Sequence, residues 1–413
     1  MTAPTDMSAS EANPALRQYL TVTGNYWAFT LTDGALRMLV VLHFHTLGYS
    51  PLQIAMLFLF YEIFGIITNL LGGWLGARWG LNRTMNAGLV LQVAALSMLL
   101  VPTPMLSVIW VMTAQALSGI AKDLNKMSAK SSLKFLVTDN AQDTLYRWVA
   151  LLTGSKNALK GIGFFLGGLL LSVLGFQGAV GAMAAALLLV WVASLFLLRG
   201  DLGKAKAKPK FTELLSKSRV VNILSAARLF LFGARDVWFV VALPVFLGAQ
   251  LGWDYWQVGG FLALWVIGYG IVQALAPAIT GRRHAAHAPD GRTALHWALP
   301  LVLVPAGMAL ALAQGVSASG VLMIGLAVFG VLFAVNSALH SYLILSYARE
   351  DGVSLDVGFY YMANAMGRLL GTVLSGWIYQ SHGLAACLWV SAGLLALAAL
   401  IARALPRHNK ASV

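Results

Sequence analysis

Twelve apolar runs divide this chain, most of them long enough to cross the hydrocarbon core of a bilayer as a helix, which takes about 20 residues. The runs fall at 18–45, 52–77, 84–103, 106–125, 146–174, 179–198, 220–248, 256–279, 294–313, 320–347, 357–380 and 383–404. Charged residues make up 10% of the chain, whereas they make up about 25% of a typical soluble domain. The sequence therefore predicts an all-α integral membrane protein with twelve transmembrane helices.

Positive charge is distributed unevenly among the loops. Turns after odd-numbered runs contain no Lys or Arg, whereas turns after even-numbered runs carry most of the Lys and Arg outside the runs. Basic loops stay on the cytoplasmic side of a membrane, so both termini are predicted to be cytoplasmic. This asymmetry accounts for most of the net charge of +13, and we expect no nucleic-acid partner.

The two halves of the chain repeat each other. The segment Leu-Gly-Tyr-Ser at 47–50 returns as Leu-Gly-Trp-Asp at 251–254, and Gly-Phe-Phe-Leu-Gly-Gly at 163–168 returns as Gly-Thr-Val-Leu-Ser-Gly at 371–376. The repeat predicts two pseudo-symmetric six-helix bundles, at 17–198 and 219–404, joined by a basic cytoplasmic linker at 199–218. Segments 1–16 and 405–413 are then the cytoplasmic tails.

Several charged residues lie inside the apolar runs. Burying a cation there costs at least ~2.5–3.5 kcal/mol, so each is a candidate functional residue. The acids at this depth are Asp33, Glu62 and Asp236, and the more numerous cations favour an anionic solute. These cations are Arg37, Lys156, Lys160, Arg228, Arg235 and Arg368.

Helical spacing groups these cations. Lys156 and Lys160 are one turn apart and Arg228 and Arg235 two turns apart, so each pair lies roughly on one helix face. The repeat places Lys160 opposite Arg368, one cation from each half. We therefore predict that Lys160 and Arg368 contact the substrate, with the other cations beside them.

Two parallel halves around a midplane site resemble the major facilitator superfamily, whose members transport solutes by alternating access. The loop at 73–80 resembles that family's pattern Gly-x-Leu-Ala-Asp-Arg-x-Gly, with Gly73, Arg78 and Gly80 as candidate gating residues and Ala77 in place of the acid. In this fold the third, sixth, ninth and twelfth helices are outer supports, and those runs carry no charge away from their ends. The segment 163–168 resembles the core of an antiporter motif, although glycines there also permit close helix packing.

Some of the acids are candidates for coupling transport to protons. Glu62 is the first candidate, because a carboxyl group removed from water holds its proton more readily, and Asp33 and Asp236 follow. Each also has a structural alternative. Glu62 could pair with a cavity cation, and Asp33 with Arg37 at i,i+4 spacing. Asp236 could pair with Arg228, with Arg235 or with a neighbouring helix.

Four lysines recur every fourth residue at the inner end of the fourth run: Lys122, Lys126, Lys130 and Lys134. We expect this stripe to be a solvated helix end that faces anionic lipids. The alternative is a cytoplasmic funnel that attracts anions.

Four longer segments, at 25–45, 121–132, 154–160 and 357–365, resemble the organoarsenical efflux permeases of arsenic resistance. The resemblance implies export of 1-arseno-3-phosphoglycerate across a bacterial inner membrane. It also implies a functional link to glyceraldehyde-3-phosphate dehydrogenase, which forms this compound when arsenate replaces phosphate.

The cysteine, histidine and side-chain amide residues also agree with a phosphorylated anion as the solute. The single cysteine, Cys387, and the scattered histidines form no metal-ligand pattern, so no metal or cofactor is expected. Neutral hydrogen bonds are expected from Asn25, Asn157 and Asn364, and also from Gln273 and Asn336.

The sequence thus predicts a monomeric, proton-coupled antiporter in the lipid bilayer that exports a small phosphorylated organic anion. Another carrier, for a different organic phosphate or a drug, is the first alternative. A membrane-embedded enzyme or sensor is a remote one, since no catalytic motif is visible.

Overall fold

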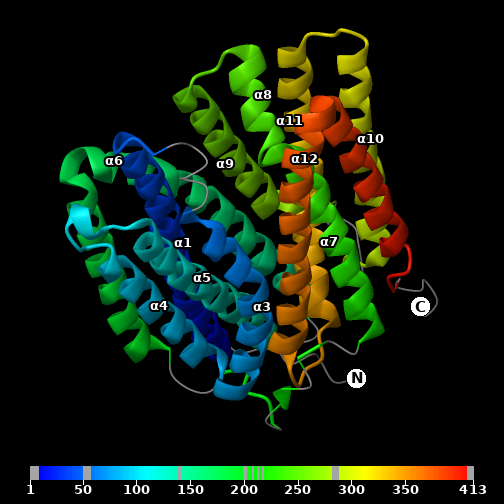
Figure 1. Ribbon diagram of the computed structural model, residues 1–413. Coiled ribbons are helices and arrows are strands. Elements are labelled where there is room, and N and C mark those ends of the chain that lie inside the picture. The colour runs from blue at the N-terminus through cyan, green and yellow to red at the C-terminus, as the bar shows by residue number, and fades with distance from the viewer. Residues whose placement is uncertain are drawn as a thin grey trace, which may run out of the picture.

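The computed structural model describes residues 9–49, 57–137, 141–198, 202–206, 209–211, 214–215, 218–280 and 288–406. Parts of the predicted tails and of the predicted linker lie outside these residues. The regular elements are helices, as predicted (Figure 1). They are α1 (Ala9–Thr46), α3 (Leu59–Trp79), α4 (Leu81–Met98), the 3-10 turn η1 (Thr103–Met105), α5 (Val108–Leu136), α6 (Gln142–Leu197), α7 (Arg219–Phe239), α8 (Ala242–Leu251), α9 (Tyr255–Ile279), α10 (Gly291–Ala313), α11 (Ala318–Tyr347) and α12 (Val353–Ala402).

Two helices are much longer than a bilayer is thick, and each bends at a glycine. Gly175 interrupts the 56 residues of α6 with φ 68° and ψ 179°, and Gly383 interrupts the 50 residues of α12 with φ 74° and ψ −175°. Glycine adopts positive φ without the steric penalty of a Cβ atom. Figure 1 shows α12 reversing its direction at this bend, so a single glycine makes the turn that the sequence predicted between two apolar runs.

The apolar run at 220–248 forms two helices rather than one. α7 ends at Phe239 and α8 begins at Ala242. Pro244 has no N–H to donate and its ring clashes with the carbonyl four residues earlier, which explains the break. The freed N–H of Ala242 donates instead to Ser375 Oγ of α12 at 3.0 Å.

Six of the described helical segments are long and apolar enough to cross a membrane: α6, the α7–α8 segment, α9 from Trp256, α10, α11 and α12. α1 and α5 do not meet this criterion, and both carry charged residues in their central turns. The count of twelve spans and the cytoplasmic position of the termini stay predictions.

The two halves share a buried core at one end of the molecule. One buried core combines residues from the start of α1, the end of α5 and the start of α6 with residues from α7, α11 and α12. Two other cores are each confined to one half, the first to residues 28–191 and the second to residues 230–398. We call the end with the shared core the inner end, because the charge pattern of the loops predicts that it is cytoplasmic.

Backbone contacts at glycines close this inner end. A Cβ atom added to Gly154 of α6 would lie 2.4 Å from the Ala274 nitrogen of α9, and one added to Gly73 of α3 would lie 2.3 Å from the Ser354 oxygen of α12. Such distances are shorter than van der Waals contact, so these helices touch backbone to backbone. Gly167 likewise packs against Ala35 of α1, which supports the packing interpretation of the 163–168 segment.

Candidate functional site

A cavity of about 430 Å³ lies between the two halves. Its wall includes residues toward the outer end, such as Met38 and Gly259, and nine Lys or Arg side chains against three acids. The six cations predicted from the sequence are all among them, together with two of the three predicted acids. The cations are Arg37, Lys122, Lys126, Lys130, Lys156, Lys160, Arg228, Arg235 and Arg368, and the acids are Asp33, Glu62 and Asp123.

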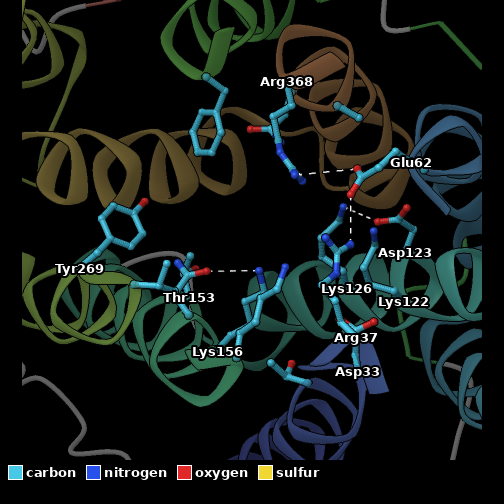
Figure 2. A pocket seen from close by; sticks show the side chains of 18 of the residues that line it. Asp33, Arg37, Glu62, Lys122, Asp123, Lys126, Thr153, Lys156, Tyr269 and Arg368 are labelled. Atoms are coloured by element: carbon cyan, nitrogen blue, oxygen red, sulfur yellow. Dashed lines mark hydrogen bonds and ion pairs between the residues drawn. The ribbon is translucent and has the colours of Figure 1, made fainter. Parts of the chain in front are cut away.

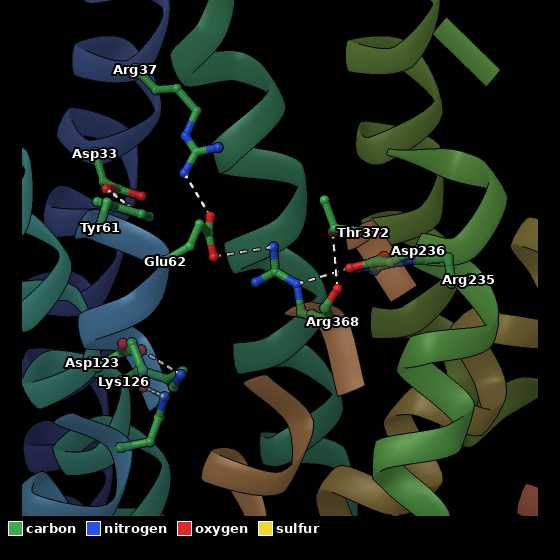
Figure 3. A network of polar contacts seen from close by, with 12 residues as sticks. Asp33, Arg37, Tyr61, Glu62, Asp123, Lys126, Arg235, Asp236, Arg368 and Thr372 are labelled. Carbon is green, nitrogen blue, oxygen red and sulfur yellow. Dashed lines mark hydrogen bonds and ion pairs between the residues drawn. The ribbon is translucent and has the colours of Figure 1, made fainter. Parts of the chain in front are cut away.

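An ionic network crosses the cavity from one half to the other (Figure 3). Arg37 of α1 lies 3.2 Å from Glu62 of α3, whose second oxygen lies 3.8 Å from Arg368 of α12. Arg368 also contacts Asp236 of α7 at 3.2 Å, and Asp236 contacts Arg235 at 2.6 Å. Glu62 is therefore the carboxylate that joins a cation of each half.

The alternative that paired Asp33 with Arg37 is not the observed geometry. Asp33 accepts a hydrogen bond of 2.7 Å from the Tyr61 hydroxyl of α3, because its side chain turns toward that helix. Arg37 faces Glu62 instead, and its guanidinium lies 4.8 Å from the Tyr61 ring centroid. For Glu62, the ion pair that the sequence left as an alternative is the observed geometry.

Arg228 has neutral partners. Its Nε donates to Asn364 Oδ1 at 2.9 Å, and one terminal nitrogen donates to the Ser337 carbonyl at 3.3 Å. The guanidinium also lies 3.9 Å from the Phe232 ring centroid. Asp236 thus neutralises Arg235 and Arg368, and Arg228 remains a buried cation, 3% exposed, held by carbonyl oxygens and a ring.

The interpretation of the α5 lysines as a lipid-facing stripe is wrong for three of the four. Lys122, Lys126 and Lys130 line the cavity, because α5 continues to Leu136 inside the bundle, well beyond the apolar run that ends at 125. Lys126 contacts Asp123 at 2.6 Å, and Lys122 lies 3.7 Å from the centroid of the Tyr61 ring. The four-residue period was the signal that could have found them, since it places the lysines on one helix face.

Figure 2 shows how the cations face each other. Lys156 of α6 and Lys122 and Lys126 of α5 extend into the cavity from one wall, and Arg368 extends from the opposite wall. Within the part of the chain that the structure describes, the Lys160 ammonium has no hydrogen-bond or ion-pair partner. The cavity therefore presents converging positive charge that its own acids only partly neutralise.

The predicted neutral donors divide into two groups. Asn157 and Asn364 line the cavity, and Asn157 Nδ2 donates to Gln273 Oε1 of α9 at 2.6 Å, which joins the two halves. Asn25 is not in the cavity wall. Its Nδ2 donates to Ser194 Oγ at 2.8 Å within the first half, so it is a packing residue here. Asn336 also lies outside the wall and donates to the Trp297 carbonyl.

The predicted gating residues lie at the inner end. Gly73 allows the contact with α12, Arg78 lies 5.0 Å from the Trp74 ring centroid, and Gly80 adopts φ 91° between α3 and α4. Among the described residues, no three His, Cys, Asp or Glu side chains converge as a metal site requires.

Comparisons with solved structures identify the architecture. The human organic anion transporter MFSD10 (TETRAN) superposes with a TM-score of 0.71 and 16% identity, over 97% of this chain and 100% of the other. The Escherichia coli fucose:proton symporter FucP gives 0.70 and 13%, over 94% and 98%. A bacterial homologue of the iron transporter ferroportin, in an outward-facing state, gives 0.69 and 17%, over 95% and 98%.

At the level of sequence, a search of curated proteins gives no match. The model of the Major Facilitator Superfamily matches residues 20–355. Together with the apolar helices, this match shows that the chain is a multi-pass membrane protein and belongs to the Major Facilitator Superfamily, a family of transporters.

Proposed function

We propose that this chain is a secondary active transporter that exports a small organic anion with at least two negative groups, most specifically 1-arseno-3-phosphoglycerate. The observation that carries the proposal is the charge of the cavity wall, nine cations against three acids. Buried charges in proteins are normally paired, so this surplus calls for an anionic ligand. The volume of about 430 Å³ lies within the range of about 300–1,000 Å³ of small-molecule sites.

The specific substrate is supported by where the resembling segments lie. Each of the four segments that resemble organoarsenical permeases contributes to the cavity wall. Segment 25–45 supplies Arg37, segment 121–132 supplies Lys126, segment 154–160 supplies Lys160 and segment 357–365 supplies Asn364. Each resembling segment thus contributes residues to the wall that would surround a solute.

Alternating access explains how such a cavity would export an anion. The halves share a buried core at the inner end. If that end is cytoplasmic, as the loop charges predict, this arrangement corresponds to the state from which an exporter would release its solute outward. An interior-negative membrane potential favours the exit of anions by about 2.3 kcal/mol per charge per 100 mV.

Glu62 would link protons to this cycle. When ionised it neutralises Arg37 and Arg368, so a change in its protonation would change the charge that faces the solute.

Inverted membrane vesicles test this function. The substrate is generated outside the vesicles from labelled arsenate, glyceraldehyde 3-phosphate, NAD and the dehydrogenase. Vesicles that contain this chain should accumulate arsenic several-fold above vesicles without it, and only when the dehydrogenase is present. Equal accumulation in both kinds of vesicle would contradict the proposal. Transport of labelled 3-phosphoglycerate with no transport of arsenic would favour the alternative, a carrier for another organic phosphate.

A further inference from the structure

Part of the cavity's charge surplus is concentrated near the inner end. Lys126 and Lys130 lie 5.1 and 4.4 Å from the centroid of the same Tyr361 ring, and Arg228 lies 5.3 Å from the centroid of the adjacent Tyr360 ring. Lys156 of α6 lines the same cavity. We call Lys126, Lys130, Lys156 and Arg228 the inner cluster, and among the described residues Lys126 is the one member that contacts a carboxylate, that of Asp123.

Lys130 is the most enclosed lysine of the inner cluster. Its side chain is 6% exposed, its ammonium donates to the Tyr361 hydroxyl, and it lies 4.4 Å from the Tyr361 ring centroid. No carboxylate contacts it among the described residues. A buried ammonium next to other cations and without a counter-ion is unfavourable, and a bound anion would remove that cost.

Two hydroxyl groups in the same wall point to a ligand independently of the charges. Tyr26 is 2% exposed and Thr153 is 5% exposed, and both line the cavity. Within the described residues, neither hydroxyl has a hydrogen-bond partner. Proteins leave few buried polar groups unpaired, so each of these calls for an explanation. An oxyanion with several acceptor atoms could accept from both hydroxyls and from the lysines.

We propose that the inner cluster, with Tyr26 and Thr153, binds the phosphoryl group of the transported anion. Lysine is suited to this role, because its ammonium is a compact charge with three donors. The acyl end of the solute then faces Arg37 and Arg368, whose guanidiniums now hold the carboxylate of Glu62. This assignment rests on the proposed function, in that it takes the solute to be an organic phosphate.

Calorimetric titration of the purified, full-length chain tests the assignment with three probes: inorganic phosphate, 3-phosphoglycerate and glycerate. Lys130→Gln should weaken the binding of inorganic phosphate and of 3-phosphoglycerate by about tenfold or more, as expected for a lost charged hydrogen bond. The affinity for glycerate should stay within about twofold of that of the unmodified chain. Lys134→Gln is the matched control, because Lys134 belongs to the same lysine stripe but lies outside the cavity wall. It should bind all three probes like the unmodified chain.

Two further variants, Thr153→Val and Tyr26→Phe, distinguish a loss of phosphate binding from a loss of folding stability. Their hydroxyls have no hydrogen-bond partner among the residues that the structure describes, so neither substitution should lower the unfolding temperature, yet both should weaken phosphate binding several-fold. The assignment is overturned if the unmodified chain binds no phosphate, or if Lys130→Gln weakens the binding of glycerate as much as the binding of 3-phosphoglycerate. Phosphate binding of the predicted kind without any movement of arsenic in vesicles would instead contradict the export function alone.

Discussion

At the scale of single residues, Lys160 and Arg368 differ in their ion-pair partners, although the sequence repeat makes them counterparts. Arg368 neutralises Glu62 and Asp236, whereas Lys160 has no ion-pair partner among the described residues. A cation that balances protein carboxylates stabilises the fold, and one without partners is available to a solute. The repeat offset reveals the correspondence but not this difference, because the acids come from other helices.

Substitutions at these two positions should separate binding from stability. Lys160→Gln should abolish transport or reduce it at least tenfold with an unchanged unfolding temperature. Arg368→Gln should impair transport and also destabilise the protein by on the order of 1–3 kcal/mol, since two carboxylates lose a partner that is only partly buried. Vesicle uptake and thermal unfolding of the purified variants measure the two effects. Full transport by Lys160→Gln at normal protein levels would exclude Lys160 from the site.

Glu62→Gln tests the proton link. The amide cannot ionise, so it should abolish the dependence of transport on a pH gradient while leaving movement driven by the membrane potential. The measurement is uptake into inverted vesicles with each gradient imposed separately. If the variant responds to the pH gradient as the unmodified chain does, Glu62 is only the structural ion pair seen between Arg37 and Arg368.

At the scale of helices, the glycine contacts between α6 and α9 hold the inner end closed. Gly154→Ala would place a Cβ atom 2.4 Å from backbone atoms of α9. The halves cannot then pack as they do here, so the substitution should shift the population toward states that are open at the inner end. Spin labels on the inner ends of α6 and α9 should report a longer distance. Gly376→Ala is the control, since its Cβ atom would meet no neighbour within 4 Å, and an identical distance in both variants would contradict this role.

Whether a helix boundary could be predicted depended on the residues that lie at that boundary. The bends at Gly175 and Gly383 fell where the apolar runs were divided, because glycine marks them in the sequence. α5 was cut short at residue 125, since an apolar criterion ends before Lys126, whereas Lys126 and Lys130 face a polar cavity rather than lipid. The partners of Asp33 and Arg37 could not be predicted either, because they come from α3 and depend on packing across helices.

At the scale of the whole molecule, one shared core closes the inner end and the basic cavity lies between the halves on its outer side. The two-fold repeat, the segregation of charged from uncharged runs and the surplus of cations were all visible in the sequence. The ionic network from Arg37 to Arg235 was not, since it draws on four helices. This arrangement places the carboxylate of Glu62 between Arg37 and Arg368, where an anionic solute could take its place.

The most direct measurement of the central claim uses the purified chain in liposomes that enclose the dehydrogenase, NAD, glyceraldehyde 3-phosphate and labelled arsenate. Labelled arsenic should appear outside these liposomes, and should stay inside when glyceraldehyde 3-phosphate is omitted or when the chain carries Lys160→Gln. Release of arsenic at the same rate without glyceraldehyde 3-phosphate, or no release in the complete mixture, would contradict export of the arseno compound through this basic cavity.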